Sequence, residues 1–175
     1  MKKGIVLVLV VGMVLLGVYA LAAGMDEGGS ALDRLVTLGG PLEIALPEKD
    51  SIALGKTVDA YVLSWEAPGA VHSYTVSAML EITRPDGNSY LYLADGMMGT
   101  WDIKDGAGKT HKVKNAIVEA TELGGNATSV DVAAYLNKLM GERFEAGTRV
   151  RCVVCVLVVP EAGAPVVQAV EVPVK

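Results

Sequence analysis

The sequence contains few of the residues that carry most enzyme and metal chemistry. It has two His, two Cys and a single Phe, Phe144, among 175 residues. Two cysteines cannot supply the four ligands of a structural zinc site. No Gly-x-Ser-x-Gly or comparable motif places a nucleophile beside a histidine. An enzyme would need a pocket with His72 or His111 beside Asp102 or Asp105, so we expect no enzymatic activity and no cofactor.

Positive charge is also scarce, and no basic patch or basic helix is evident. The chain has 15 Lys and Arg against 20 Asp and Glu, which gives a net charge of −5. Lys2 and Lys3 are the only charges before Asp26, so the rest of the chain carries −7. Nucleic-acid binding requires clustered Lys and Arg, and we therefore expect no nucleic-acid partner.

One long uncharged run stands at the N-terminus, from Ile5 to Ala23. As a helix, its 19 residues would extend about 28 Å, and the hydrocarbon core of a bilayer is about 30 Å thick. The lysines before the run and the acids after it place everything from Gly24 onward outside the cytoplasm. We expect an extracellular or cell-surface protein that contacts a membrane at least during export.

Three fates of this run are open. Ala20-Leu21-Ala22 matches the small-x-small pattern of a signal peptide, with cleavage before Ala23. A retained run would be a membrane anchor. Lys3-Gly4 resembles the leader of type IV pilins, which is cut after a small residue and leaves the hydrophobic helix on the mature protein. Glycines soon after the run interrupt the longer helix of pilins, so we place cleavage first, the anchor second and the pilin fate third.

The sequence divides into three parts. Residues 1–23 form the signal peptide or transmembrane helix, residues 24–41 a linker or assembly arm, and residues 42–175 a β-sandwich domain. The arm contains a stretch from Ser30 to Leu38 whose apolar spacing fits a short helix or an extended strand. Residues 30–46 offer an arm that could add a strand to the sheet edge of a neighbouring copy. The arm side chains that we expect to contact that copy are Leu32, Leu35, Val36, Leu38, Leu42 and Ile44.

β-Strand patterns dominate after the arm. The clearest runs from Tyr74 to Thr83, where alternation predicts a buried face and a solvent-exposed face with Thr75, Ser77 and Glu81. Residues 84–88 have turn chemistry, and 89–94 form the return strand of a hairpin. Further strands are predicted at 42–46, 58–65, 112–121, 149–159 and 166–174.

One segment changes to helical spacing, over about 129–144. Thr128 or Ser129 would cap this helix, with Asp131 in its first turn. Seven or eight short strands around one inserted helix predict a mainly β fold, an immunoglobulin-like β-sandwich, although the Cys and Trp spacing of immunoglobulin domains is absent.

The Gly-rich stretch from Asp105 to Thr110 suggests a phosphate loop but lacks its first glycine, because Ile103 stands there. We interpret it as a hairpin loop. Asp95, Asp102 and Asp105 offer oxygen ligands for Ca²⁺, although their spacing is not that of an EF-hand. We prefer a solvated acidic loop without metal.

Cys152 and Cys155 are three apart in a predicted strand and therefore point to opposite faces. Cys152 is interpreted as a core residue. Cys155 would face outward, which leaves a disulfide between subunits open. Asn126-Ala127-Thr128 is a glycosylation sequon that an exported domain can use.

The export segment, the β domain and the missing catalytic motifs together predict a structural surface protein. In outline, a hydrophobic leader before a β-sandwich resembles pilin-type and TasA-type fibre subunits. That resemblance implies a homo-oligomer or filament built by strand addition or through the N-terminal segment. The alternative is a membrane-anchored binding or accessory domain of a larger complex.

Overall fold

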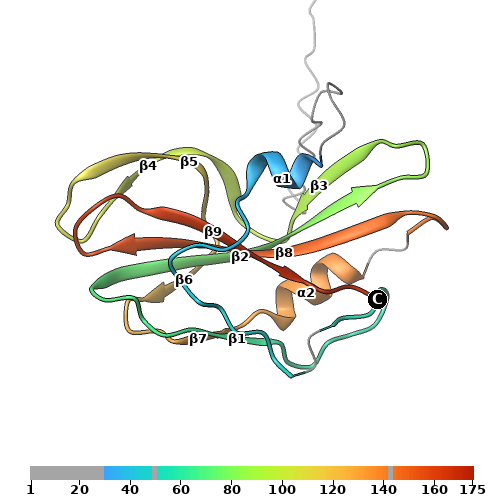
Figure 1. Ribbon diagram of the computed structural model, residues 1–175, viewed down its shortest axis with the longest axis horizontal. Helices are drawn as coiled ribbons and strands as arrows, with labels where there is room; N and C mark the ends of the chain where they lie inside the picture. The colour runs from blue at the N-terminus through green and yellow to red at the C-terminus, as the bar shows by residue number, and fades with distance from the viewer. Residues whose placement is uncertain (1–29, 49–50, 142–143) are drawn as a thin grey trace, which may run out of the picture.

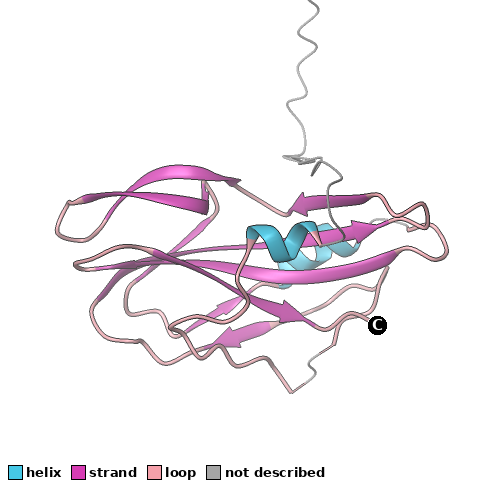
Figure 2. Ribbon diagram, turned by 45° about the horizontal axis from the view of Figure 1, so that its top comes forward, coloured by secondary structure: helices cyan, strands magenta, loops and turns pink. Residues whose placement is uncertain are grey.

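The computed structural model describes residues 30–48, 51–141 and 144–175. The hydrophobic run and its three fates lie outside these residues. Within the described ranges, no helix is both long enough and apolar enough to cross a membrane. The fold is mainly β, with several antiparallel sheets and two short helices (Figure 2).

In the described part of the chain, the elements are a short helix, seven strands, a second helix and two final strands. They are α1 (Ala31–Leu35), β1 (Val62–Ser64), β2 (Val71–Thr83), β3 (Ser89–Leu93), β4 (Met97–Lys104), β5 (Thr110–Val118), β6 (Thr121–Gly124), β7 (Ser129–Asp131), α2 (Ala133–Met140), β8 (Arg149–Pro160) and β9 (Val166–Val172).

The central sheet is built around two long antiparallel strands, β2 and β8, in the order β3-β2-β8-β9. Their pairing extends from Val71 opposite Pro160 to Thr83 opposite Arg149. β3 and β6 share the other edge of β2, since β3 pairs with residues 79–83 and β6 with residues 73–76. Two smaller sheets, β1–β7 and the β4–β5 hairpin, complete the fold (Figure 1).

Both faces of the central sheet are buried, so the predicted solvent-exposed face of β2 is wrong. Thr75, Ser77 and Glu81 are only 7%, 0% and 3% exposed. α1 and the β4–β5 hairpin cover this face, whereas β1, β7 and α2 cover the other (Figure 1). Polar residues can be buried on this face because they are hydrogen-bonded. The Ser77 hydroxyl, for example, donates to the Asp95 carbonyl at 2.8 Å.

The inserted helix exists but begins later than predicted, because residues 129–131 form β7. Neither Thr128 nor Ser129 caps it. The Asp131 carboxylate instead accepts from the backbone N–H groups of Tyr61 at 3.0 Å and Ala133 at 2.9 Å. These bonds lower the pKa of Asp131 and link the end of β7 to the start of α2.

Two other predicted strands are shorter than expected, and one observed strand was not expected. The stretch 58–65 contributes only β1, and 42–46 contributes one bridge, Ala45 to Ser64. β4 was not predicted. The turn at 84–88 is confirmed, since Arg84 N–H donates to the Asn88 carbonyl at 2.9 Å and Gly87 has a φ of 86°.

Candidate functional site

The arm begins with α1, which lies across the central sheet. The Ser30 hydroxyl accepts from Asp33 N–H at 3.2 Å and caps the helix. Ala31 and Leu32 are buried against the sheet. At the other end of α1, the Asn115 side chain donates to the Leu35 carbonyl over 2.7 Å. A side chain therefore hydrogen-bonds to a backbone group at each end of this very short helix.

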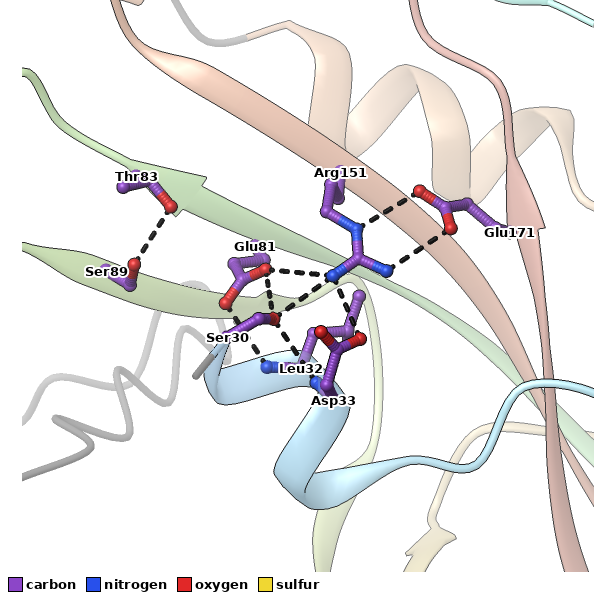
Figure 3. A network of polar contacts seen from close by, with 8 residues as sticks. All are labelled: Ser30, Leu32, Asp33, Glu81, Thr83, Ser89, Arg151 and Glu171. Carbon is purple, nitrogen blue, oxygen red and sulfur yellow. Dashed lines mark hydrogen bonds and ion pairs between the residues drawn. The ribbon is translucent and has the colours of Figure 1, made fainter. Parts of the chain in front are cut away.

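A buried carboxylate of the sheet holds the start of α1 (Figure 3). Glu81 of β2 accepts from the Ser30 hydroxyl at 2.6 Å and from Leu32 N–H at 3.2 Å. Its cross-strand neighbour, Arg151 of β8, places Nη1 3.6 Å from Glu81 Oε2. A charge can be buried at this depth because hydrogen bonds and an opposite charge surround it.

Arg151 connects three strands and the arm through one guanidinium. It donates in a bidentate manner to Glu171 of β9, at 3.1 Å and 3.3 Å. Nη1 also reaches Asp33 of α1 at 3.0 Å and the Ser30 hydroxyl at 3.1 Å. Glu171, and after it Asp33, raise the pKa of Arg151, so its charge is held firmly in place (Figure 3).

After α1 the arm follows the edge of β9. Gly39 N–H donates to the Ala169 carbonyl at 2.9 Å, and Ala169 N–H donates to the Thr37 carbonyl at 3.3 Å. The Gln168 side-chain amide then binds both backbone groups of Leu42, at 2.6 Å and 2.9 Å. The arm is thus attached to an open strand edge by backbone pairing of the kind that strand addition uses.

The six predicted arm residues fall into three groups. Leu32, Val36 and Leu42 are buried in the core of their own domain, at 0%, 6% and 3% exposure. Leu35 and Ile44 are half-buried. Leu38 is 45% exposed and is the most exposed of the six.

An open groove of about 480 Å³ adjoins the arm. Its walls are residues 35–37 after α1, residues 111–115 of β5 and residues 164–167 at the start of β9. Among the described residues, β5 pairs only with β4, and β9 pairs with β8 and with the arm near Ala169. The groove therefore lies between two strand edges with unpaired backbone groups.

Asp105 and His111 meet beside this groove, at the turn of the β4–β5 hairpin. Asp105 is 5% exposed, and its Oδ2 lies 2.9 Å from His111 Nε2. It also accepts from Lys109 N–H at 2.8 Å and Gly163 N–H at 3.0 Å. The contact with His111, and after it these backbone donors, lower the pKa of Asp105 to about 2.

This His–Asp contact is the arrangement that an enzyme would need. The groove walls, however, contain no Ser, Cys, Asp or Glu, and both Asp105 oxygens are engaged in closing the turn. Through Gly163, Asp105 joins the turn of the hairpin to the β8–β9 connection. The Gly-rich stretch is a hairpin loop, as predicted, with Gly108 at a φ of 83°.

The three aspartates considered for Ca²⁺ do not share a site. Asp95 and Asp102 are exposed, whereas Asp105 is buried. Asp95 precedes β4 and Asp105 follows it, so about 30 Å of extended chain separates them. Nowhere in the described ranges do three or more His, Cys, Asp or Glu come together to hold a metal ion.

Both cysteines are buried, and on opposite faces as predicted. Cys152 belongs to the core beneath α2, and Cys155 to the core beneath α1. The expectation that Cys155 faces outward is wrong, because it is 1% exposed. Burial raises the pKa of the Cys155 thiol to about 12 and also raises that of Cys152. A disulfide between subunits would therefore require this core to open.

Two surface features complete the site description. Asn126, the asparagine of the glycosylation sequon, is exposed in the turn between β6 and β7. The second feature was missed at the sequence level: the β4–β5 hairpin carries a cluster of exposed lysines, although no basic patch was expected. They are Lys104, Lys109, Lys112 and Lys114. The i, i+2 spacing of the last two was the available signal, since it places both on one face of a strand.

Comparison of the chain with protein-family models, with curated proteins and with solved structures finds no match. Its function has therefore to be inferred from its own residues.

Proposed function

We propose that this chain is an extracellular structural protein, a subunit of a cell-surface filament or envelope assembly. The observation that carries the proposal is the arm of residues 30–46, which pairs through its backbone with the edge of β9 and then reaches β1. A segment that adds to its own sheet edge can add to the same edge of a neighbour with identical contacts. Subunits would then be linked by exchanged arms or through the N-terminal segment.

The polar network under α1 is compatible with such an exchange. When an arm leaves, Glu81 loses Ser30 and Leu32 but keeps Arg151, its cross-strand neighbour on the sheet. Arg151 in turn keeps Glu171. The sheet therefore does not retain an unpaired buried charge while it waits for another arm, which is the costly outcome in such networks.

The finer fold assignment belongs to the same proposal. We infer an immunoglobulin-like β-sandwich in which the central sheet and the β1–β7 sheet enclose the main core. Leu63 of β1 and Val76 of β2, each 0% exposed, meet in that core. The β4–β5 hairpin is then an addition on the outer face of the larger sheet. Exported surface subunits with this architecture need no catalytic centre, in keeping with a non-enzymatic role.

Assembly is tested by electron microscopy and sedimentation of the purified, exported protein. A synthetic peptide of residues 30–46 should compete for the β9 edge and, in excess, shorten or dissolve assemblies. A scrambled peptide of the same composition is the control. Assemblies that are insensitive to the peptide would overturn strand addition, and a monodisperse monomer at high concentration would overturn the structural role.

The groove beside the arm favours a second candidate, a membrane-anchored binding or accessory domain. The edge of β5, the start of β9 and a volume of about 480 Å³ suit an extended peptide of a partner. Mass spectrometry of the N-terminus from the native host distinguishes these roles. A start at residue 23 or 24 indicates secretion, a start at 5 the pilin route, and a start at 1 or 2 the retained anchor that this candidate requires.

A further inference from the structure

The outer face of the β4–β5 hairpin carries a pair of exposed cations. Lys112 and Lys114 lie two residues apart on β5 on either side of Val113, which packs inward; both lysines are exposed and also border the groove beside the arm. Their spacing along the strand is about 7 Å. Within the described ranges neither side chain has a hydrogen bond or ion pair, although Asp102 lies opposite Lys112 in the hairpin.

This cationic pair belongs to a protein whose net charge is negative. Over the whole β4–β5 hairpin, residues 97–118, four lysines face two aspartates, which gives +2, whereas the whole chain carries −5 and its remainder therefore −7. Asp105 is buried and turned toward His111, so it does not neutralise the lysines at the surface. The hairpin is thus a local positive surface on an otherwise negative protein.

A matching pair of exposed anions lies on the β1 side. In the register of the antiparallel bridge between Ala45 and Ser64, Glu43 of the arm and Glu66, which follows β1, fall at opposing positions. Both are exposed and, within the described part of the chain, have no ion-pair partner. Like charges in neighbouring cross-strand positions repel each other. Val62, 44% exposed, adds an apolar side chain to this outer face.

The two pairs lie on layers that cover opposite faces of the central sheet. The hairpin packs on one face through Val113, and β1 packs on the other through Leu63. One molecule cannot bring its own lysine pair to its own glutamate pair, but two copies can. Because the two surfaces differ, such a contact is heterologous and repeats from copy to copy without closing on a dimer.

We propose that Lys112 and Lys114 of one copy dock on Glu43 and Glu66 of the next, and that this contact stacks subunits head to tail. The inference rests on the proposed structural function and deepens it, because it names the partner as a second copy and gives the assembly a polarity. Charge pairs at an exposed contact set orientation and association rate, and their effect weakens with salt.

Charge reversal tests this contact with the full exported chain. One double variant is Lys112→Glu with Lys114→Glu, and the other is Glu43→Lys with Glu66→Lys. Each alone gives a molecule whose two faces carry the same sign. We expect the concentration for half-assembly, measured by sedimentation in low salt, to rise about tenfold or more for each. A 1:1 mixture restores opposite faces and should assemble as an alternating copolymer.

The matched control for the lysine variant is Lys138→Glu with Lys175→Glu, which changes net charge by the same amount but lies outside both pairs. Circular dichroism and melting temperature confirm that every variant folds, since all these side chains are exposed. Restored assembly in the mixture supports the contact. If the double variants assemble as wild type does, this contact is overturned and the structural function stands.

Two other outcomes have different meanings. A wild-type chain that stays monomeric at every salt concentration overturns the structural function together with this contact. A monomer whose sedimentation shifts only when dextran sulfate is added, and no longer does so after Lys112→Glu with Lys114→Glu, identifies a polyanion as the occupant. That result overturns a second copy as the partner.

Discussion

The arm and the β4–β5 hairpin both cover the same face of the central sheet, and a buried carboxylate fastens each of them differently. Glu81 belongs to the sheet, accepts a hydrogen bond from Ser30 at the start of α1 and forms an ion pair with Arg151. Asp105 belongs to the hairpin itself and is held by His111 and backbone amides of Lys109 and Gly163. The Glu81 contacts join the arm to the sheet, which are separate parts, whereas the Asp105 contacts close the turn of the hairpin itself.

This difference indicates which part can detach. Loss of the arm leaves the sheet carboxylate with a cationic neighbour, so the sheet stays electrostatically satisfied. If the hairpin detaches, Asp105 loses the Gly163 N–H donor, which helps to lower its pKa, and keeps only His111 and Lys109 of its own turn. We therefore expect the arm to open before the hairpin does. The four predictions below test this order from the largest expected effect to the smallest.

The largest effect is expected from removing the shared cation. Arg151→Met leaves Glu81 buried without an opposite charge, so the free energy of unfolding should fall by about 3 kcal/mol. Urea denaturation measures it. Arg149→Met on the same strand is the control, because Arg149 is exposed and should change stability by less than about 0.5 kcal/mol. Equal effects of the two substitutions would show that the network does not hold the arm.

A slightly smaller effect is expected within the arm. Leu32→Ala removes a fully buried side chain and should cost about 2 kcal/mol in the same denaturation experiment. Leu38→Ala, at the 45% exposed position, should cost less than about 0.5 kcal/mol. If Leu32→Ala proved as harmless as Leu38→Ala, α1 would not be docked on its own sheet in solution.

Asp105→Asn tests the hairpin attachment and its pH dependence. The melting temperature at neutral pH should fall by about 5 °C, because charge-assisted hydrogen bonds are weakened. The folded-state pKa of Asp105, about 2, lies below its ordinary value of 3.8. Its stabilisation is therefore full above about pH 4 and is lost as pH falls through about 2.

The difference between wild type and Asp105→Asn should accordingly shrink between pH 4 and pH 2 in thermal melts. Asp102→Asn, three residues earlier and exposed, should leave the melting temperature within about 1 °C. A difference that is constant from pH 5 to pH 2 would contradict this role of the Asp105 charge.

The smallest effect is a change in thiol labelling. Cys155 lies in the core beneath the arm and Cys152 in the core on the opposite face, so they report separately on the two sides. Burial raises both pKa values, and labelling of the native protein at pH 8 should be slow. In the Leu32→Ala background, Cys155 should react several-fold faster while Cys152 does not change. Mass spectrometry of labelled peptides distinguishes them, and parallel acceleration would indicate global unfolding instead of arm opening.

Local chemistry made part of the fold predictable from sequence. The β2–β3 hairpin follows from strict alternation and a Pro-Asp-Gly turn. The placement of the two cysteines on opposite faces of the sheet follows from strand geometry. The face of Thr75, Ser77 and Glu81 was misjudged because polarity does not report burial when another element supplies hydrogen bonds. Only the tertiary cover of that face, by α1 and the β4–β5 hairpin, decides its environment.

The site was predictable only in outline. The arm was located by its apolar residues, but Glu81 and Arg151 lie 70 residues apart and meet only through the pairing of β2 with β8. β4 was missed since glycines at 96 and 99 interrupt its pattern, and α2 began late because Ser129 to Asp131 pair with β1. In each case the outcome depends on pairing between strands that are distant in the sequence, and local patterns in a single sequence do not reveal such pairing.

The attachment of the arm has a mechanical consequence. Tension applied to the chain before Ser30 reaches α1 first and loads the contacts with Glu81 and Arg151 before any strand of the core. Twelve residue pairs join β2 to β8, whereas far fewer contacts attach the arm, so we expect the arm to peel away under force before that ladder opens.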